Sequence, residues 1–285
     1  MFKKIVIALL VVSMLVVFGA CGKTETPTVT PPAEPDSSNQ GEEPTEEGKI
    51  GEIKKAGKLV LGTAADYPPY EFHKIINGKD EIVGFDIEIA KLIAADLGVE
   101  LEIVDMKFEG LLPALVTDDI DIIVAGMVAD EERAKTVDFS IPYYEANQRM
   151  IVREEDKDTY KGPEDLVGKP IGAQKSTIQE QIALDKYSQS KYVGLSKITD
   201  LVLELQNKKI DAVLLAEPVA KAYVKQNPSL YLADIDLGKE DGVCVAIKKG
   251  NPDFLQAIDA LMERIVHDGT VDKLINDATI LAEEE

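Results

Sequence analysis

The feature that most constrains the fold is an alternation of strand-like and helix-like segments, which occurs twice along the chain. In the first half, short apolar runs at 58–64, 101–105 and 121–125 predict buried strands, and helices are predicted between them at 86–97 and 110–117. Strands that alternate with helices build mostly parallel sheets flanked by helices. We therefore expect an α/β protein.

The second half repeats this arrangement. Strands are predicted at 169–174 and 210–215, and a helix at 200–206 leads into the second of them. The two halves also match locally, because LVTDDIDIIVA at 115–125 is similar to LQNKKIDAVLL at 205–215. We interpret the chain as two lobes of similar α/β build.

Two segments are candidates for the connections between the lobes, residues 143–152 and the apolar run 242–248. A chain that crosses twice ends on the lobe where it began. We therefore predict that lobe 1 comprises 50–146 and 244–285, and that lobe 2 comprises 147–243. Two crossing strands form a hinge, and a cleft above a hinge can close around a ligand.

The N-terminus has the pattern of a secretory signal peptide over residues 1–20. Lys3 and Lys4 precede an apolar stretch, and two small residues precede Cys21. This pattern resembles the lipobox of bacterial lipoproteins, in which the signal is removed and the Cys carries the lipid. The alternative is an uncleaved anchor helix. The polar segment that follows predicts a disordered tether, so that 21–49 anchors a folded domain to the outside of the cell membrane.

Composition excludes several classes of function. The chain has 31 Lys and Arg against 52 Asp and Glu, and its net charge of −21 repels nucleic-acid phosphates. With only two Cys and two His, little remains for a metal site or for Cys/His catalysis, and we expect no cofactor. Cys244, between two valines, is predicted to be a buried small apolar residue.

Five sequence blocks carry a specific resemblance over about residues 50–275. They are GTAADYPPYEF, GFDIEIAKLIA, FEGLLPAL, AGMVADEERAKTVDFSIPYY and DAVLLAEPVAKAYV, in this order. Together they resemble the polar amino-acid-binding proteins of bacterial ABC importers, the family 3 extracellular solute-binding proteins. The resemblance implies a two-lobe periplasmic-binding-protein fold of type II, with a two-strand hinge. It also implies a monomer that binds a free amino acid, delivers it to a membrane permease and performs no chemistry.

The resemblance places the centre of the first lobe's site at Arg133. A guanidinium can hold the α-carboxylate of a ligand through two parallel hydrogen bonds. The residues alone also allow a surface ion pair with neighbouring acids. Gly126 and Val128, in the preceding loop, are expected to offer main-chain contacts, and Val128 lacks the hydroxyl of the Thr or Ser usual in the family. Tyr67 and Phe108 correspond to the aromatic walls of the ligand side-chain site.

In the second lobe, the resemblance points to a helix start. Lys175, Ser176, Thr177 and Ile178 precede or begin this helix, where free N–H groups favour a carboxylate. Thr177 with Glu180 is also a capping-box pattern, and both interpretations can hold together. Lys175 could line the side-chain end of the pocket.

The sequence departs from the family at Ala216, where most members carry an Asp that holds the ligand ammonium. Glu217 follows one residue later and is our preferred substitute for this Asp. Alternatively, the ligand has no ammonium in the usual place. Glu217 can also be a carboxylate in the first turn of a helix that starts near Pro218.

Three functions remain open from the sequence. The first is the amino-acid receptor of an importer. The second is a sensor whose cleft takes a small carboxylate other than an amino acid, because a fold does not fix a role. The third is a dehydratase-type enzyme, for which Glu217 is the one acid–base candidate, because His73 and His267 have no matching partner. The five blocks favour the receptor.

Overall fold

The computed structural model describes residues 48–284. The predicted signal peptide 1–20, Cys21 and nearly all of the predicted tether 21–49 lie outside the described residues. Lys49 already begins the first helix, one residue before the predicted start of the folded part. In the part of the chain that is described, no helix has the length and apolar character that crossing a bilayer requires.

The first sheet has the strand order β5-β1-β6-β13-β7. Its parallel core consists of β1 (Lys58–Thr63), β5 (Glu100–Asp105) and β6 (Ile122–Ile123). The late strand β13 (Ala246–Lys248) pairs antiparallel with β6, and β7 (Val137–Phe139) pairs antiparallel with β13. The strand predicted at the end of the first half is thus only two residues long, because its chain turns away after Ile123.

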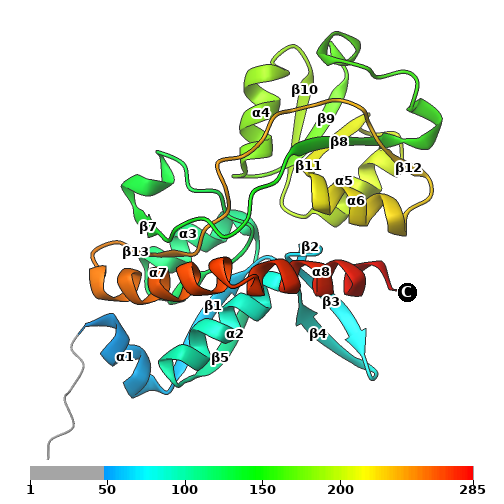
Figure 1. The fold of residues 1–285 in the computed structure, drawn as a ribbon. Coiled ribbons are helices and arrows are strands. Elements are labelled where there is room, and N and C mark those ends of the chain that lie inside the picture. Colours follow the sequence, from blue (N-terminus) through cyan, green and yellow to red (C-terminus); the bar gives the residue numbers. More distant parts are fainter. Residues whose placement is uncertain (1–47, 285) are drawn as a thin grey trace, which may run out of the picture. The chain divides into compact units, whose positions relative to one another are not determined.

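The second sheet has the order β10-β9-β11-β8-β12. Here the parallel core consists of β9 (Pro170–Gln174), β10 (Lys191–Leu195) and β11 (Ala212–Ala216). The strand β8 (Gln148–Arg153) pairs antiparallel with β11, and β12 (Leu230–Leu232) pairs antiparallel with β8. In both sheets the fourth strand comes from a chain segment that has just crossed from the other sheet (Figure 1). The prediction of a two-lobe α/β fold is confirmed.

Helices flank both sheets (Figure 1). In order they are α1 (Lys49–Ala56), α2 (Phe85–Leu97), α3 (Phe108–Val116), α4 (Ile178–Lys186), α5 (Ile198–Gln206), α6 (Glu217–Gln226), α7 (Pro252–His267) and α8 (Thr270–Glu283). Short 3₁₀ turns occur at Arg133–Lys135, Glu154–Asp156 and Pro163–Leu166.

The burial of β11 shows how one strand serves two helical layers. Ala212 and Leu214 pack in a cluster with Ala183 of α4. Val213 and Leu215 point the other way, into the cluster that contains the apolar faces of α5 and α6. All five residues of β11 are buried, because successive side chains of a strand face opposite sides of the sheet.

A small third sheet was not predicted from the sequence. It joins β2 (Asp66–Tyr67), β3 (Glu71–Ile76) and β4 (Lys79–Val83) in antiparallel pairs. Asn77 and Gly78 form the turn between β3 and β4, with φ angles of 52° and 78°. An Asn-Gly pair is the favoured sequence for a two-residue hairpin turn, so this element could have been found.

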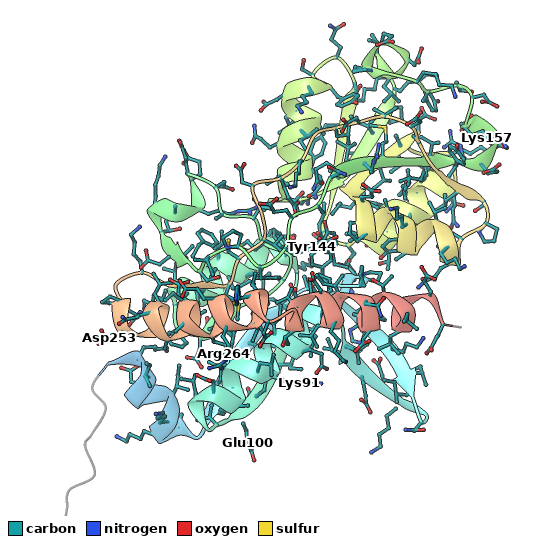
Figure 2. The ribbon with its side chains drawn as sticks, in the orientation of Figure 1. Lys91, Glu100, Tyr144, Lys157, Asp253 and Arg264 are labelled. Carbon is teal, nitrogen blue, oxygen red and sulfur yellow. The ribbon has the colours of Figure 1, made fainter. Side chains whose placement is uncertain are left out.

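The two crossing segments lie side by side and are joined by main-chain hydrogen bonds. Tyr143 N donates to Val243 O at 3.0 Å, and Val243 N donates to Tyr144 O at 2.8 Å. Figure 1 shows the two segments together between the sheets, and Figure 2 labels Tyr144 there. At Gly242, where φ is 101°, a Cβ atom would lie 2.7 Å from Pro142 Cβ, so the close approach requires glycine. The residue boundaries of the lobes stay a prediction.

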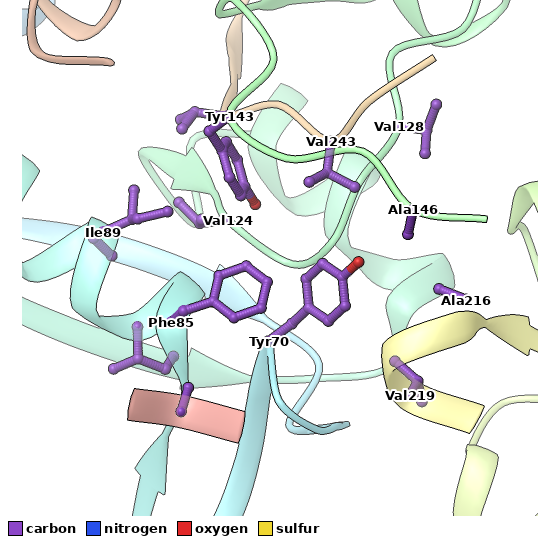
Figure 3. Packing of buried hydrophobic residues seen from close by; sticks show 14 of the residues in the cluster. Tyr70, Phe85, Ile89, Val124, Val128, Tyr143, Ala146, Ala216, Val219 and Val243 are labelled. Carbon is purple, nitrogen blue, oxygen red and sulfur yellow. The ribbon is translucent and has the colours of Figure 1, made fainter. Parts of the chain in front are cut away.

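Aromatic residues fill the core next to this crossing (Figure 3). The rings of Tyr70 and Phe85 are 4.4 Å apart between centroids, and Tyr144 stands edge-on to Tyr70 at 5.9 Å. Cys244 is 3% exposed, and burial raises the pKa of its thiol to about 11. The prediction of a buried, unreactive Cys244 agrees with this environment.

Candidate functional site

A pocket lies where the strand ends and α3 of the first lobe meet the start of α4 in the second lobe. Residues of both lobes line it, and it opens to solvent. Its lining consists of Ala64, Tyr67, Glu71, Phe108, Ala125, Gly126, Val128, Arg133, Gln174, Thr177, Ile178 and Gln179. Seven of the residues predicted from the sequence are among these.

Arg133 is buried in this pocket and is only 9% exposed. Its Nη1 donates to Val128 O at 2.6 Å, and its Nη2 donates to Ser176 O at 2.7 Å. Asp130 Oδ2 lies 3.1 Å from Nε, and burial lowers the pKa of the guanidinium while Asp130 offsets this. Because Ser176 belongs to the second lobe, the guanidinium joins the two lobes. It does not point into bulk water, which the surface ion pair would require.

Tyr67 and Phe108, the predicted aromatic walls, both line the pocket. The Arg133 guanidinium stacks over Phe108, 5.6 Å from the ring centroid. The Tyr67 hydroxyl accepts a hydrogen bond from Gln179 Nε2 at 3.3 Å, and its ring lies 5.1 Å from Tyr70. These contacts hold both rings in place at the edge of the pocket.

Gly126 reaches the pocket in a left-handed conformation, with φ of 57°. A Cβ atom here would lie 3.1 Å from the Tyr67 ring, so glycine lets the loop pass close to this wall. Its N–H donates to Asp86 Oδ2 at 2.7 Å, and the carbonyl of Val128 is used by Arg133. The Gly126 N–H and the Val128 carbonyl therefore already have protein partners.

The start of α4 is capped as predicted. Thr177 Oγ1 accepts from Glu180 N at 3.2 Å and donates to Gln174 O at 2.6 Å. Ser176 N donates to Glu180 Oε2 at 2.7 Å, so this donor is occupied. Lys175 and Ser176 are exposed, and their side chains do not line the pocket. Thr177 and Ile178 do line it.

Neither Glu217 nor Ala216 lines this pocket, although the backbone of Ala216 hydrogen-bonds the hydroxyl of Tyr67. Glu217 lines a different pocket, where it pairs with Lys221 Nζ at 2.7 Å and Arg149 Nε at 3.5 Å and accepts from Asn147 Nδ2 at 3.1 Å. The hydrogen bond from Lys221 lowers the pKa of Glu217. Ala216 is buried as the N-cap residue of α6. The structure does not bring Glu217 to Arg133, and it matches the alternative of a first-turn helix carboxylate.

The pocket contains one acid that sequence reasoning did not select, Glu71 on β3. It is 1% exposed, and within residues 48–284 no protein group donates a hydrogen bond to its carboxylate oxygens. Its carboxyl meets that of Asp86, to which it donates a hydrogen bond when protonated. Burial raises the pKa of this carboxyl well above its ordinary value, and the nearby charge of Asp86 adds to the effect. A buried carboxyl whose neighbour is another acid is costly to ionise, so it suits a ligand that brings cationic donors. The signal was a Glu inside the apolar run YPPYEF.

The chain is similar to several known proteins. The sequence model of the bacterial extracellular solute-binding proteins, family 3, matches residues 59–278. The arginine-binding extracellular protein ArtP of Bacillus subtilis is 34% identical over 242 residues, which are 84% of this chain and 88% of that protein. A probable histidine-binding protein of Campylobacter jejuni is 32% identical over 233 residues, with coverage of 81% and 88%.

A solved structure extends this likeness to three dimensions. It is an amino-acid ABC transporter substrate-binding protein from Streptococcus pneumoniae bound to L-arginine, with a TM-score of 0.79 and 40% identity. The match covers 82% of this chain and 99% of that chain.

Proposed function

Because the chain belongs to the bacterial extracellular solute-binding proteins of family 3, we propose that its ligand is L-arginine or another amino acid with a cationic side chain. The chain is an extracytoplasmic receptor that binds a free amino acid for an ABC importer. Its family consists of receptors and not of enzymes. The proposal concerns which amino acid enters the pocket.

Arg133 supplies the binding partner of the ligand α-carboxylate. Its guanidinium already bonds two carbonyl oxygens, one from each lobe. A carboxylate that takes two parallel N–H bonds is a stronger acceptor than these neutral carbonyls. A bound amino acid therefore replaces them and keeps the lobes together through the same guanidinium.

Glu71 carries the proposal for a cationic side chain. Its carboxyl is buried in the pocket beside Asp86, and no group among residues 48–284 donates a hydrogen bond to its oxygens. A guanidinium offers five N–H donors in a plane and satisfies both oxygens at once. The flat faces of Tyr67 and Phe108, which line the same pocket, suit the delocalised group of such a ligand.

The same proposal includes attachment to the membrane. The pattern of Lys3 and Lys4, an apolar stretch and Cys21 supports removal of residues 1–20 and lipidation of Cys21, and we expect the mature protein to be a monomer. Replacing Cys21 by Ser is expected to release the protein from the membrane fraction.

The test is isothermal titration calorimetry with L-arginine and with L-citrulline, its neutral analogue of nearly the same shape. Wild type is expected to prefer arginine strongly. Glu71→Gln should weaken arginine binding by roughly 100-fold, because it leaves a buried guanidinium without its counter-charge, and should change citrulline binding little. Glu217→Gln is the matched control and should leave both affinities unchanged.

The outcomes separate the roles of the two acids. If Glu71→Gln lowers the affinity for arginine and for citrulline equally, Glu71 binds the ligand α-ammonium. This result would contradict its proposed role in binding the ligand side chain. A loss in Glu217→Gln would restore this residue as the substitute for the Asp missing at Ala216. If wild type binds histidine or glutamine in preference to arginine, the proposed ligand is wrong.

A further inference from the structure

One turn of the second lobe is held by two carboxylates of the first lobe. The turn is Ser196–Ile198, between β10 and α5. Asp66 Oδ2, on β2, accepts from Ile198 N at 2.7 Å. Glu109 Oε1, in the first turn of α3, accepts from the Ser196 hydroxyl at 2.5 Å. Neither acid lines the pocket that contains Arg133.

Helix α5 has no cap of its own. Its N-cap residue is Lys197, which has the extended backbone of an N-cap residue, with φ of −121° and ψ of 138°, but makes no side-chain cap bond. The first amides of a helix have no partner within the helix and need an acceptor from elsewhere. Asp66 provides this acceptor from the other lobe.

Further contacts hold Asp66 in this position. Gln174 Nε2 lies 3.5 Å from Asp66 Oδ1 and donates to Ser196 O at 3.1 Å, and the Tyr223 hydroxyl donates to Asp66 O at 2.8 Å. Gln174 and Tyr223 both belong to the second-sheet lobe. The contacts to Asp66 join the two lobes, so they exist only while the lobes are together, whereas the bond from Gln174 to Ser196 lies within the second lobe.

We propose that Asp66 and Glu109 form a closure latch that receives the turn Ser196–Ile198 and slows the release of any bound amino acid. They are positioning residues, because they act on the lobes and do not line the ligand pocket. When the lobes separate, water replaces the latch at the start of α5. The latch therefore stabilises the closed state and leaves the first encounter with the ligand unchanged.

The latch depends on a hydrogen-bond acceptor more than on a negative charge. Burial raises the pKa of Asp66 to about 6, and the bond from the Ile198 amide only partly offsets this. Removing the charge of the Asp66 carboxylate from water is thus costly, whereas its oxygen is needed as the acceptor for the buried amide of Ile198. An Asn, which keeps one acceptor oxygen, should preserve most of the latch.

The experiment measures association and dissociation of L-arginine by stopped-flow fluorescence with the full mature chain. Asp66→Ala should raise the dissociation rate roughly tenfold, because it leaves the Ile198 amide unpaired in the closed state, with the association rate unchanged. Asp66→Asn should restore most of the slow release. Ser196→Ala, which removes only one donor, should give about a threefold increase.

A pair of substitutions at Lys197 tests the cap itself. Lys197→Ser gives α5 a cap inside its own lobe, which stabilises the open state and should raise the dissociation rate about threefold above that of Lys197→Ala. Asp200→Ala is the control, because Asp200 is exposed in the first turn of the same helix and acts equally in both states.

The set of variants tests the proposed latch even if one of them folds poorly. Unchanged dissociation in Ser196→Ala together with equal rates for the two Lys197 variants would overturn the latch, as would a parallel loss of association in Asp66→Ala. The latch does not depend on the identity of the ligand. Should wild type fail to bind L-arginine, the ligand proposal fails, and the kinetics are then measured with the amino acid that most raises the melting temperature.

Discussion

Two carboxylates on the same hairpin have opposite surroundings. Glu71 is buried, and no group among residues 48–284 donates a hydrogen bond to its oxygens. Asp66, five residues earlier, accepts from the main chain of Ile198 in the other lobe and lies within reach of Gln174. Burial raises the pKa of both carboxyls. One acid is thus left for a ligand, and the other is satisfied by the protein itself.

This difference separates recognition from closure. A buried carboxylate that receives no hydrogen bond from the protein discriminates between ligands, because only a ligand with suitable donors offsets the free-energy cost of burying it. A carboxylate whose partner is the opposite lobe contributes equally for every ligand that permits closure. Affinity and specificity then depend on different residues, although they lie on one short hairpin.

Arg133 is the residue that combines both roles, so its replacement has the largest expected effect. It lines the pocket and also donates to Ser176 O across the lobes. Arg133→Met should reduce binding of every amino acid roughly 1000-fold, through loss of a bidentate, buried charge pair. Lys135→Met removes the same charge from an exposed site on the same turn and should change nothing. Calorimetry that finds Arg133→Met within tenfold of wild type would contradict the role in binding.

Variants of Glu71 and Asp66 can be compared directly when both are titrated with the same two ligands, L-arginine and L-citrulline. Asp66→Ala should weaken L-arginine and L-citrulline by the same factor, roughly tenfold, because the latch does not touch the ligand. Glu71→Gln should instead reduce the preference for arginine. The measurement is the ratio of the two affinities by calorimetry. A ratio that changes in Asp66→Ala would show that the two acids act as one cluster.

The sequence was sufficient for the fold and for one side of the site. Apolar spacing located α2, predicted at 86–97, to within one residue, because its buried residues Phe85, Ile89 and Ile93 follow one face of a helix. Thr177 and Glu180 identified the start of α4 because a cap is a local interaction. Arg133, Tyr67 and Phe108 came from the family blocks, and the pocket contains all three.

The rest depends on contacts that sequence spacing does not encode. Glu217 lies one residue from the family position, but the chain enters α6 there and the carboxylate meets Lys221 and Arg149 in a different pocket. Glu71 was visible as a polar residue in an apolar run. Which face of β3 turns toward the pocket is decided by the hairpin, and the hairpin was missed. The partner of Asp66 lies 132 residues away along the chain.

The smallest expected effect concerns a third buried acid, Glu240. It tests whether a buried acid that has hydrogen-bond partners still lowers the stability of the fold when it ionises. It lies two residues before the second crossing segment, where it accepts from Ala146 N at 3.2 Å and Gln148 Nε2 at 2.7 Å. Burial raises its pKa to about 7, and the two hydrogen bonds only partly oppose this. The folded state therefore holds a proton more tightly than the unfolded chain does.

The sign of the pH effect follows from this shift. The stabilisation from Glu240 is complete below the ordinary pKa of a Glu and is lost as the pH rises through about 7. Wild type should therefore lose melting temperature between pH 5 and pH 8, and Glu240→Gln should lose about 4 °C less. Asp86, whose pKa is also raised to about 7, is present in both proteins, so both should still lose some melting temperature as the pH rises.

The quantity that tests this prediction is the change of melting temperature with pH, measured by calorimetric melting of the ligand-free protein. The absolute melting temperature also changes, because the amide of the variant meets the Gln148 amide. Glu100→Gln, an exposed acid on β5, should reproduce the wild-type slope. If Glu240→Gln and wild type lose the same number of degrees, Glu240 is ionised in the fold without cost. Protein partners alone would then be enough to hold a buried charge, and the contrast between Glu71 and Asp66 would rest on hydrogen bonding and not on burial.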